Sequence, residues 1–157
     1  MTERELKISF LEYDSLEELS ESDRSLAISA IEAIDGSYAP YSHFNVGAAV
    51  LLSDGTIVKG ANQENAAYPS GLCAERTAMF AAGAAYPELQ MRSIAVAARQ
   101  DGVLCPEPAA PCGACRQVMA QYQTKSGQPM SVILVGSKKV QKFTRVDDLL
   151  PFIFDNI

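Results

Sequence analysis

The sequence predicts an α/β fold, a three-layer α/β/α sandwich around one mixed five-stranded sheet. Two observations predict it. Segments with apolar residues at helical spacing alternate with short apolar runs typical of strands, and together they follow in the order α, β, β, α, β, α, β, β. With 157 residues, of which 48% are hydrophobic, the chain suits one packed domain, 1–157. Residues 1–21 form an N-terminal extension whose mixed pattern predicts no single element.

The first half of the chain predicts a helix followed by a hairpin. A helix is expected over residues 22–34 because its apolar residues line one face, namely Leu26, Ala27, Ala30, Ile31 and Ile34. Residues 45–52 are mostly small or β-branched and apolar, which is typical of a strand covered on both faces. A turn over 53–56 then leads into an antiparallel partner strand over 57–61.

The second half predicts two helices that each begin at a cysteine motif. Alanine, methionine and phenylalanine dominate from Cys73 to Gly83, and a second helical segment covers 112–122, where Pro111 suits the first turn. Strands are expected over 93–99, 131–136 and 140–143. The last segment of the sequence, 146–157, has a short helical stretch that Pro151 interrupts.

The composition argues against two kinds of partner. A formal net charge of −6 does not suit a protein that binds nucleic acid by neutralising phosphates. The sequence has no apolar run near the roughly 20 residues of a membrane span and no secretion signal at its start. We therefore expect a soluble, cytoplasmic protein with a small-molecule substrate, no nucleic acid partner and no membrane partner.

Two cysteine motifs carry the chemistry: Cys73-Ala74-Glu75-Arg76 and Pro111-Cys112-Gly113-Ala114-Cys115-Arg116. Cysteines in a chain without a secretion signal indicate metal or redox chemistry rather than disulfides. Because the sequence has a single histidine, a zinc site must be held mainly by sulfur. Three thiolates leave the fourth zinc position open, as in a catalytic centre. Glu75, two residues after a ligand, could then move protons beside the metal.

The charge of three thiolates needs compensation. If both motifs open helices, the N–H groups at the two helix N-termini favour negative charge there. Arg76 or Arg116, each close to a ligand in sequence, could hydrogen-bond a sulfur and withdraw more charge.

Other interpretations of the cysteines stay open. Cys112 and Cys115 alone would suit a thioredoxin-like redox pair, although Cys73 at a second helix start argues against it. A closed structural zinc site would need a fourth ligand, for which Cys105 and His43 are the candidates. Cys105 is otherwise an incidental thiol in a proline-rich loop. A non-catalytic zinc module is a third alternative, but it would have no use for Glu75.

Several separated blocks resemble the nucleoside branch of the zinc deaminases, specifically the small homotetrameric cytidine deaminases. They are Tyr41-Ser42-His43-Phe44, Val46-Gly47-Ala48-Ala49, Asn62-Gln63-Glu64-Asn65-Ala66, Tyr68-Pro69-Ser70-Gly71-Leu72-Cys73-Ala74-Glu75-Arg76 and Pro111-Cys112-Gly113-Ala114-Cys115-Arg116-Gln117. The resemblance implies a cytidine deaminase-like fold, one zinc ion per subunit and a homotetramer with sites near subunit interfaces. It also implies hydrolytic deamination of free cytidine and 2′-deoxycytidine to uridine and 2′-deoxyuridine plus ammonia, a reaction of pyrimidine salvage.

The resemblance also implies roles for individual residues. Cys73, Cys112 and Cys115 would hold zinc, and Glu75 would move protons as the non-ligand glutamate of zinc deaminases does. The expected substrate contacts are Asn62 and Glu64 with the ribose 3′-hydroxyl, Phe44 and the Ala74 backbone with the base, and Phe154 with the base in a neighbouring subunit. From the sequence alone, Phe154 suits core packing equally well.

The sequence departs from the family pattern at the sugar segment and at one earlier position. Asn45 stands where proline or lysine is frequent, and Ala61-Asn62-Gln63 replaces a more usual Cys-Asn-Ile or Cys-Asn-Val, so Gln63 could alter the sugar segment. Blasticidin-type deaminases share the cysteine set, but Asn62 together with Glu64 favours a ribose. Nucleotide and polynucleotide deaminases usually have histidine in place of Cys73 and would want basic residues near the motifs.

Overall fold

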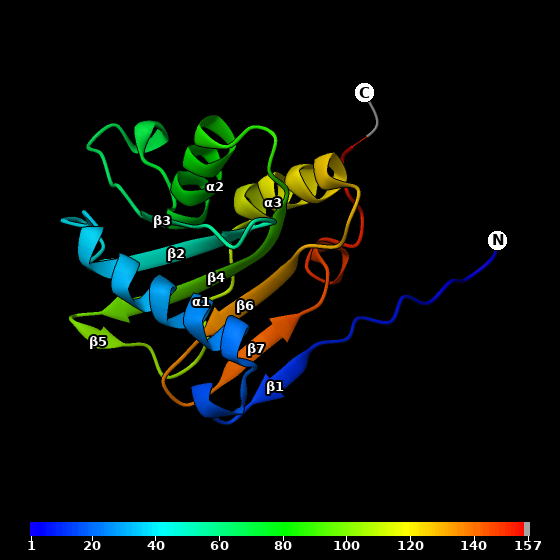
Figure 1. The fold of residues 1–157 in the computed structure, drawn as a ribbon, viewed down its shortest axis with the longest axis horizontal. Coiled ribbons are helices and arrows are strands. Elements are labelled where there is room, and N and C mark those ends of the chain that lie inside the picture. Colours follow the sequence, from blue (N-terminus) through cyan, green and yellow to red (C-terminus); the bar gives the residue numbers. More distant parts are fainter. Residues whose placement is uncertain (156–157) are drawn as a thin grey trace.

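A mixed sheet forms the middle layer of the computed structural model, which describes residues 1–155 (Figure 1). Its order is β1-β7-β6-β4-β2-β3, and β5 pairs with the end of β4. Among the strands that residues 1–155 form, only β4 and β6 pair in parallel, because α3 and its loops carry the chain back along the sheet between them. The strands are β1 (Leu11–Tyr13), β2 (Phe44–Leu52), β3 (Ile57–Ala61), β4 (Met91–Gln100), β5 (Val103–Leu104), β6 (Ser131–Val135) and β7 (Val140–Phe143).

Helices cover both faces of the sheet and confirm the three-layer arrangement (Figure 1). On one face α1 (Glu21–Ala33) buries Leu26 and Ala30 against Ala95 and Ile133. On the other face α2 (Ala74–Ala85) and α3 (Gly113–Ser126) pack with the opposite side chains of the same strands. Four short 3-10 turns complete the regular structure within residues 1–155: η1 (Leu16–Glu18), η2 (Ile34–Gly36), η3 (Tyr68–Ser70) and η4 (Val146–Asp148).

The expected five-stranded sheet is wrong in its count, because residues 1–155 contribute seven strands. The five expected strands are all present, as β2, β3, β4, β6 and β7. The additional strands, β1 and β5, have three and two residues, which is too short for an alternating pattern to be recognised. β1 lies within the N-terminal extension and pairs with the edge strand β7.

Glycines let two helices lie very close to the sheet. A Cβ atom on Gly47 of β2 would overlap the backbone of Ala30 and Ile34, and one on Gly60 of β3 would overlap the backbone of Ala78 in α2. Any side chain at these positions would push the helix away. The contact at Gly60 therefore fixes α2, and with it the residues at the N-terminus of α2, relative to the sheet.

Within the described part of the chain, no helix combines the length and the apolar character that crossing a bilayer requires.

Candidate functional site

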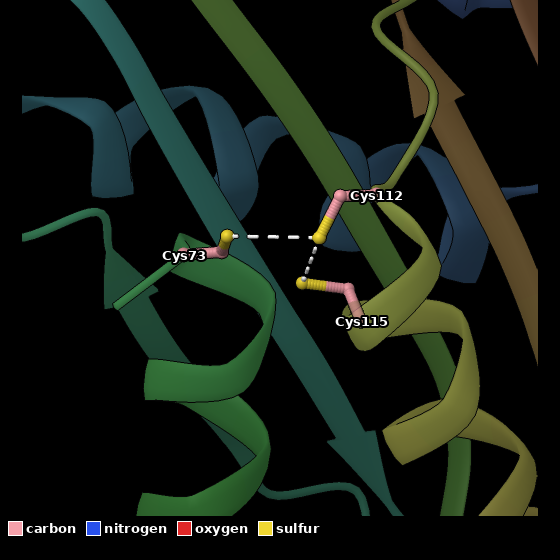
Figure 2. Close-up of side chains that lie close together, drawn as sticks. All are labelled: Cys73, Cys112 and Cys115. Atoms are coloured by element: carbon pink, nitrogen blue, oxygen red, sulfur yellow. Dashed lines mark hydrogen bonds between the residues drawn. The ribbon is translucent and has the colours of Figure 1, made fainter. Parts of the chain in front are cut away.

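Three cysteine side chains converge between the N-termini of α2 and α3 (Figure 2). Cys73 and Cys112 each stand directly before a helix, and Cys115 lies in the first turn of α3. The Sγ of Cys112 lies 3.9 Å from that of Cys73 and 3.5 Å from that of Cys115. Segments that are 39 residues apart in sequence thus bring their sulfurs together.

The geometry of this three-cysteine site fits zinc. Four ligands about 2.3 Å from a tetrahedral zinc ion are about 3.8 Å from one another, close to the sulfur separations found here. Thiolates are also ligands that zinc prefers. Within residues 1–155 neither His43 nor Cys105 joins the group, so the donors are those of an open site and not of a closed one. A thioredoxin-like redox pair needs two thiols, so the third thiol, Cys73, argues against that interpretation of Cys112 and Cys115.

The surroundings of the site favour a thiolate at Cys73, the ligand that stands directly before α2. Neither helix has a side-chain cap at its N-terminus, so first-turn N–H groups remain to interact with the sulfurs. A hydrogen bond with Cys115, joined by Arg76, lowers the pKa of Cys73 to about 5, which makes this sulfur a thiolate at neutral pH. The same hydrogen bond and burial raise the pKa of Cys115, so that Cys115 is the thiol donor of this pair.

The two arginines of the motifs have different partners. Arg76 donates from Nη2 to the Sγ of Cys73 over 3.5 Å, as one of the sequence alternatives expected. Its Nε is buried without a hydrogen-bond partner in the described structure. Arg116 instead directs its guanidinium to the backbone carbonyls of Pro111 and Leu149. Of the two candidates, Arg76 is therefore the one that bonds a ligand sulfur.

Glu75 lies in the first turn of α2 and is only 5% exposed. Burial raises the pKa of its carboxyl group, and the nearby charge of Cys73 raises it further, while a hydrogen bond with Cys115 lowers it. A raised pKa brings a carboxyl group closer to the range in which it can both take and give a proton. Ala74, directly before it, is fully buried and is the first residue of α2, so its N–H belongs to the unpaired first turn.

A cavity of about 560 Å³ opens beside Cys73 and Arg76. This volume lies in the usual range of small-molecule sites. Asn62 and Glu64, expected at the ribose, line this cavity together with Cys73, an expected zinc ligand. Phe44, Ala74, Glu75 and Phe154 are not part of its lining. It thus includes the two residues expected at the ribose and one of the expected ligands.

Asn62 and Glu64 brace the loops around the cavity. The Oδ1 of Asn62 accepts hydrogen bonds from Val46 N (2.8 Å) and Ser37 Oγ (2.5 Å), and its Nδ2 donates to Phe44 O (2.9 Å). Glu64 accepts from Tyr41 N over 2.9 Å and from the hydroxyl of Ser42. These bonds lower the pKa of the Glu64 carboxyl group. These hydrogen bonds could not be predicted from the sequence, since the partners come from distant segments.

Two tyrosines in the cavity lining were assigned no role from the sequence. Tyr41 and Tyr68 meet edge to face with their ring centroids 6.2 Å apart, and both line the cavity. Both residues stand in sequence blocks that resemble the family, and this position was the sign in the sequence that they could have a role. A single aromatic residue in a loop, however, does not reveal which cavity it borders.

Phe154 lies in the C-terminal tail and is 70% exposed, so the core-packing alternative is wrong. Its backbone carbonyl accepts a hydrogen bond from Nε2 of Gln117 over 2.7 Å. The backbone at Phe154 is thus tied to the first half of α3, the helix that carries Cys115, while the ring stays exposed.

Residues 20–130 match the family model described as the cytidine and deoxycytidylate deaminase zinc-binding region, and this range includes both cysteine motifs. A cytidine deaminase of Halalkalibacterium halodurans is 44% identical over 133 residues, which cover 84% of this chain and 94% of that protein. A cytidine deaminase of Sporosarcina psychrophila is 44% identical over 123 residues, covering 78% and 84%.

Solved structures give the same result. The crystal structure of cytidine deaminase from Burkholderia pseudomallei matches with a TM-score of 0.70 and 39% identity, over 87% of this chain and all of that one. The structure of cytidine deaminase from Mycobacterium tuberculosis matches with a TM-score of 0.65 and 32% identity, over 84% and 96%. The mixed sheet with helices on both faces is thus shared with solved cytidine deaminases.

Proposed function

Because the chain belongs to the cytidine and deoxycytidylate deaminase family, we propose that it hydrolyses free cytidine and 2′-deoxycytidine to uridine and 2′-deoxyuridine, with release of ammonia. It is a zinc enzyme whose metal site is the three-cysteine site. One observation carries the proposal: three sulfurs that can hold zinc, with no fourth metal-binding side chain grouped with them among residues 1–155, lie beside a buried glutamate, Glu75. This combination provides both an activated water and a group that moves its protons.

Cys73, Cys112 and Cys115 would hold the zinc ion, which would supply an activated water and stabilise the negative charge that develops in the reaction. Glu75 takes a proton from the attacking water, passes it to N3 of the pyrimidine, and then assists departure of the C4 amino group as ammonia. The raised pKa of its carboxyl group suits both directions of proton transfer. The helix N-termini and Arg76 offset the charge of the thiolates, which lets the water lose its proton.

The remaining expected residues bind the substrate. The Ala74 N–H at the start of α2 holds the pyrimidine, and Phe44 packs on the base. Asn62 and Glu64 grip the ribose 3′-hydroxyl, since Nδ2 of Asn62 keeps a second hydrogen to donate and the carboxylate of Glu64 keeps lone pairs to accept. The bond from Asn62 to the Phe44 carbonyl supports this division of roles, because it fixes the sugar and base positions together.

The proposal includes a homotetramer with sites near the subunit interfaces. Phe152 and Phe154 in the tail are 90% and 70% exposed, and Tyr68 in the cavity lining is 78% exposed. Large aromatic side chains exposed beside an active site suit an interface with another subunit. Phe154 would then reach the base bound in that subunit. The free thiols of the site suit a reducing compartment, which supports a cytoplasmic location.

A substrate panel tests the proposal. The purified protein would be mixed with cytidine, 2′-deoxycytidine, cytosine, cytidine monophosphate and blasticidin S, and the loss of the substrate absorbance band would be followed. We expect rapid turnover of the two nucleosides and at least about 100-fold lower kcat/KM for cytosine, because it lacks the ribose that Asn62 and Glu64 bind. Turnover of blasticidin S or the nucleotide with none of the nucleosides would overturn the assignment.

A further inference from the structure

The guanidinium of Arg116 joins two segments that are far apart in sequence. Arg116 follows Cys115 in the first turn of α3. Its Nε donates to the carbonyl of Pro111 over 2.8 Å, and its Nη1 donates to the carbonyl of Leu149 over 2.9 Å. Pro111 directly precedes Cys112, and Leu149 begins the C-terminal tail, here defined as residues 149–155. A single planar side chain therefore holds the loop before a metal ligand and the start of the tail.

The contact with Pro111 constrains Cys112. The side chain of Arg116 bonds the carbonyl before Cys112, and the backbone N–H of Arg116 bonds the carbonyl of Cys112 itself over 3.0 Å. Both bonds fix the peptide units around this ligand, whose side chain is exposed and has little packing to orient it. Groups that orient metal ligands from outside the coordination shell commonly change metal affinity about 10- to 100-fold when they are removed.

The tail is attached to the same helix at a second point and packs beside the site. The next residue, Gln117, donates to the carbonyl of Phe154 over 2.7 Å. Leu149 is buried in the core cluster that also contains Cys115, and Ile153 packs against this cluster. The tail is therefore held at both ends by adjacent residues of the metal-binding turn.

We propose that Arg116 is a positioning residue that couples docking of the C-terminal tail to zinc binding at Cys112. When Cys112 is held in its ligand position, the Pro111 carbonyl is fixed and Arg116 is aligned to bond Leu149. By linkage, a docked tail strengthens zinc binding by the same factor by which zinc strengthens docking. The proposal rests on the zinc site and not on the identity of the substrate, so its test uses no turnover measurement.

The test measures zinc release and tail accessibility in the zinc-loaded, full-length protein. Zinc release would be followed with a chromogenic chelator. Tail accessibility would be the rate at which chymotrypsin cleaves after Phe152 or Phe154, followed by intact mass with and without zinc. The variant is Arg116→Met, which keeps the length and removes the donors. The matched control is Arg92→Met, because Arg92 is an exposed arginine at the start of β4.

In the wild type we expect zinc removal to speed tail cleavage about tenfold. In Arg116→Met we expect zinc to leave about tenfold faster, and tail cleavage to be equally fast with and without zinc, because the link is cut. Arg116→Lys should resemble Arg116→Met in its tail cleavage, since one ammonium group cannot bond both carbonyls as the guanidinium does. Arg92→Met should behave like the wild type in both measurements.

A role of Arg116 in stability alone gives a different pattern. Cleavage of the Arg116→Met tail would then be faster both with and without zinc, and zinc would still protect the tail by the wild-type factor. That result, or wild-type zinc release from Arg116→Met, would overturn the proposal. A substrate other than cytidine would leave these measurements unchanged, so failure of the proposed function is distinguishable from failure of the coupling.

Discussion

At the residue scale, Glu75 distinguishes a catalytic zinc site from a structural one. The Glu75→Gln variant keeps the size and polarity of the buried side chain but cannot carry a proton. We expect it to retain zinc and to lose turnover by at least about 100-fold, the typical contribution of a general acid–base group. Zinc content per chain and kcat with cytidine measure the two effects. A near-normal kcat would show that Glu75 does not transfer the protons.

The cysteines give a second prediction at this scale. Cys112→Ala should lose both zinc and turnover, because two sulfur ligands remain where three held the metal. Cys105→Ala is the matched control, since Cys105 is a free, partly buried thiol outside the three-cysteine site. We expect the control to keep zinc and activity. Equal losses in both variants would mean that Cys105 takes part in metal binding.

The sequence predicted the three clustered cysteines and Glu75 because each stands in a short motif at a helix start. It could not distinguish Arg76 from Arg116, since both lie close to a ligand in sequence and only the packed helix directs one to a sulfur and the other to the tail. The hydrogen bonds of the Asn62 side chain could not be predicted from the sequence either. Their partners Ser37, Phe44 and Val46 come close to Asn62 only after β2 and β3 have paired.

At the scale of elements, the close packing of α2 on β3 positions Cys73 and Glu75. A Cβ on Gly60 would overlap the backbone of Ala78 and Ala74, so Gly60→Ala should displace α2 and lower the free energy of unfolding by about 1–3 kcal/mol. We also expect weaker zinc binding, because the helix carries one side of the site. Urea unfolding and zinc release measure both changes.

Gly36→Ala is the control for this substitution. A Cβ on Gly36 would meet only Ala61 Cβ, at an ordinary 3.7 Å, so stability and zinc release should stay close to wild type. Wild-type stability and zinc release in Gly60→Ala would contradict the fixed placement of α2 on the sheet.

Elements with a full period of apolar residues were predicted correctly from the sequence, whereas the shortest ones were not. The helices at 22–34, at Cys73 and at 112–122 correspond to α1, α2 and α3 within a few residues. α3 runs on to Ser126 because polar residues can continue a helix, and Gly127, with a φ of 63°, ends it. β1 is a strand because β7 offers an open edge, which is a property of the assembled sheet and not of residues 11–13.

At the scale of the whole molecule, the exposed tail aromatics predict assembly. Light scattering should give the mass of four chains. Phe154→Ala should raise KM for cytidine several-fold and leave the zinc content unchanged, because the ring would contact a substrate bound in a neighbouring subunit and not the metal. A monomer with full activity would contradict both the tetramer and the role of Phe154.

We propose that the three-cysteine site and Glu75 form a zinc-dependent deaminase centre for a free nucleoside. The most direct test is to measure cytidine turnover and zinc content on the same purified sample, with ammonia assayed as the second product. We expect about one zinc ion per chain and one ammonia for each uridine formed. A protein with one zinc per chain that leaves both cytidine and 2′-deoxycytidine unchanged would show that this centre is not a nucleoside deaminase.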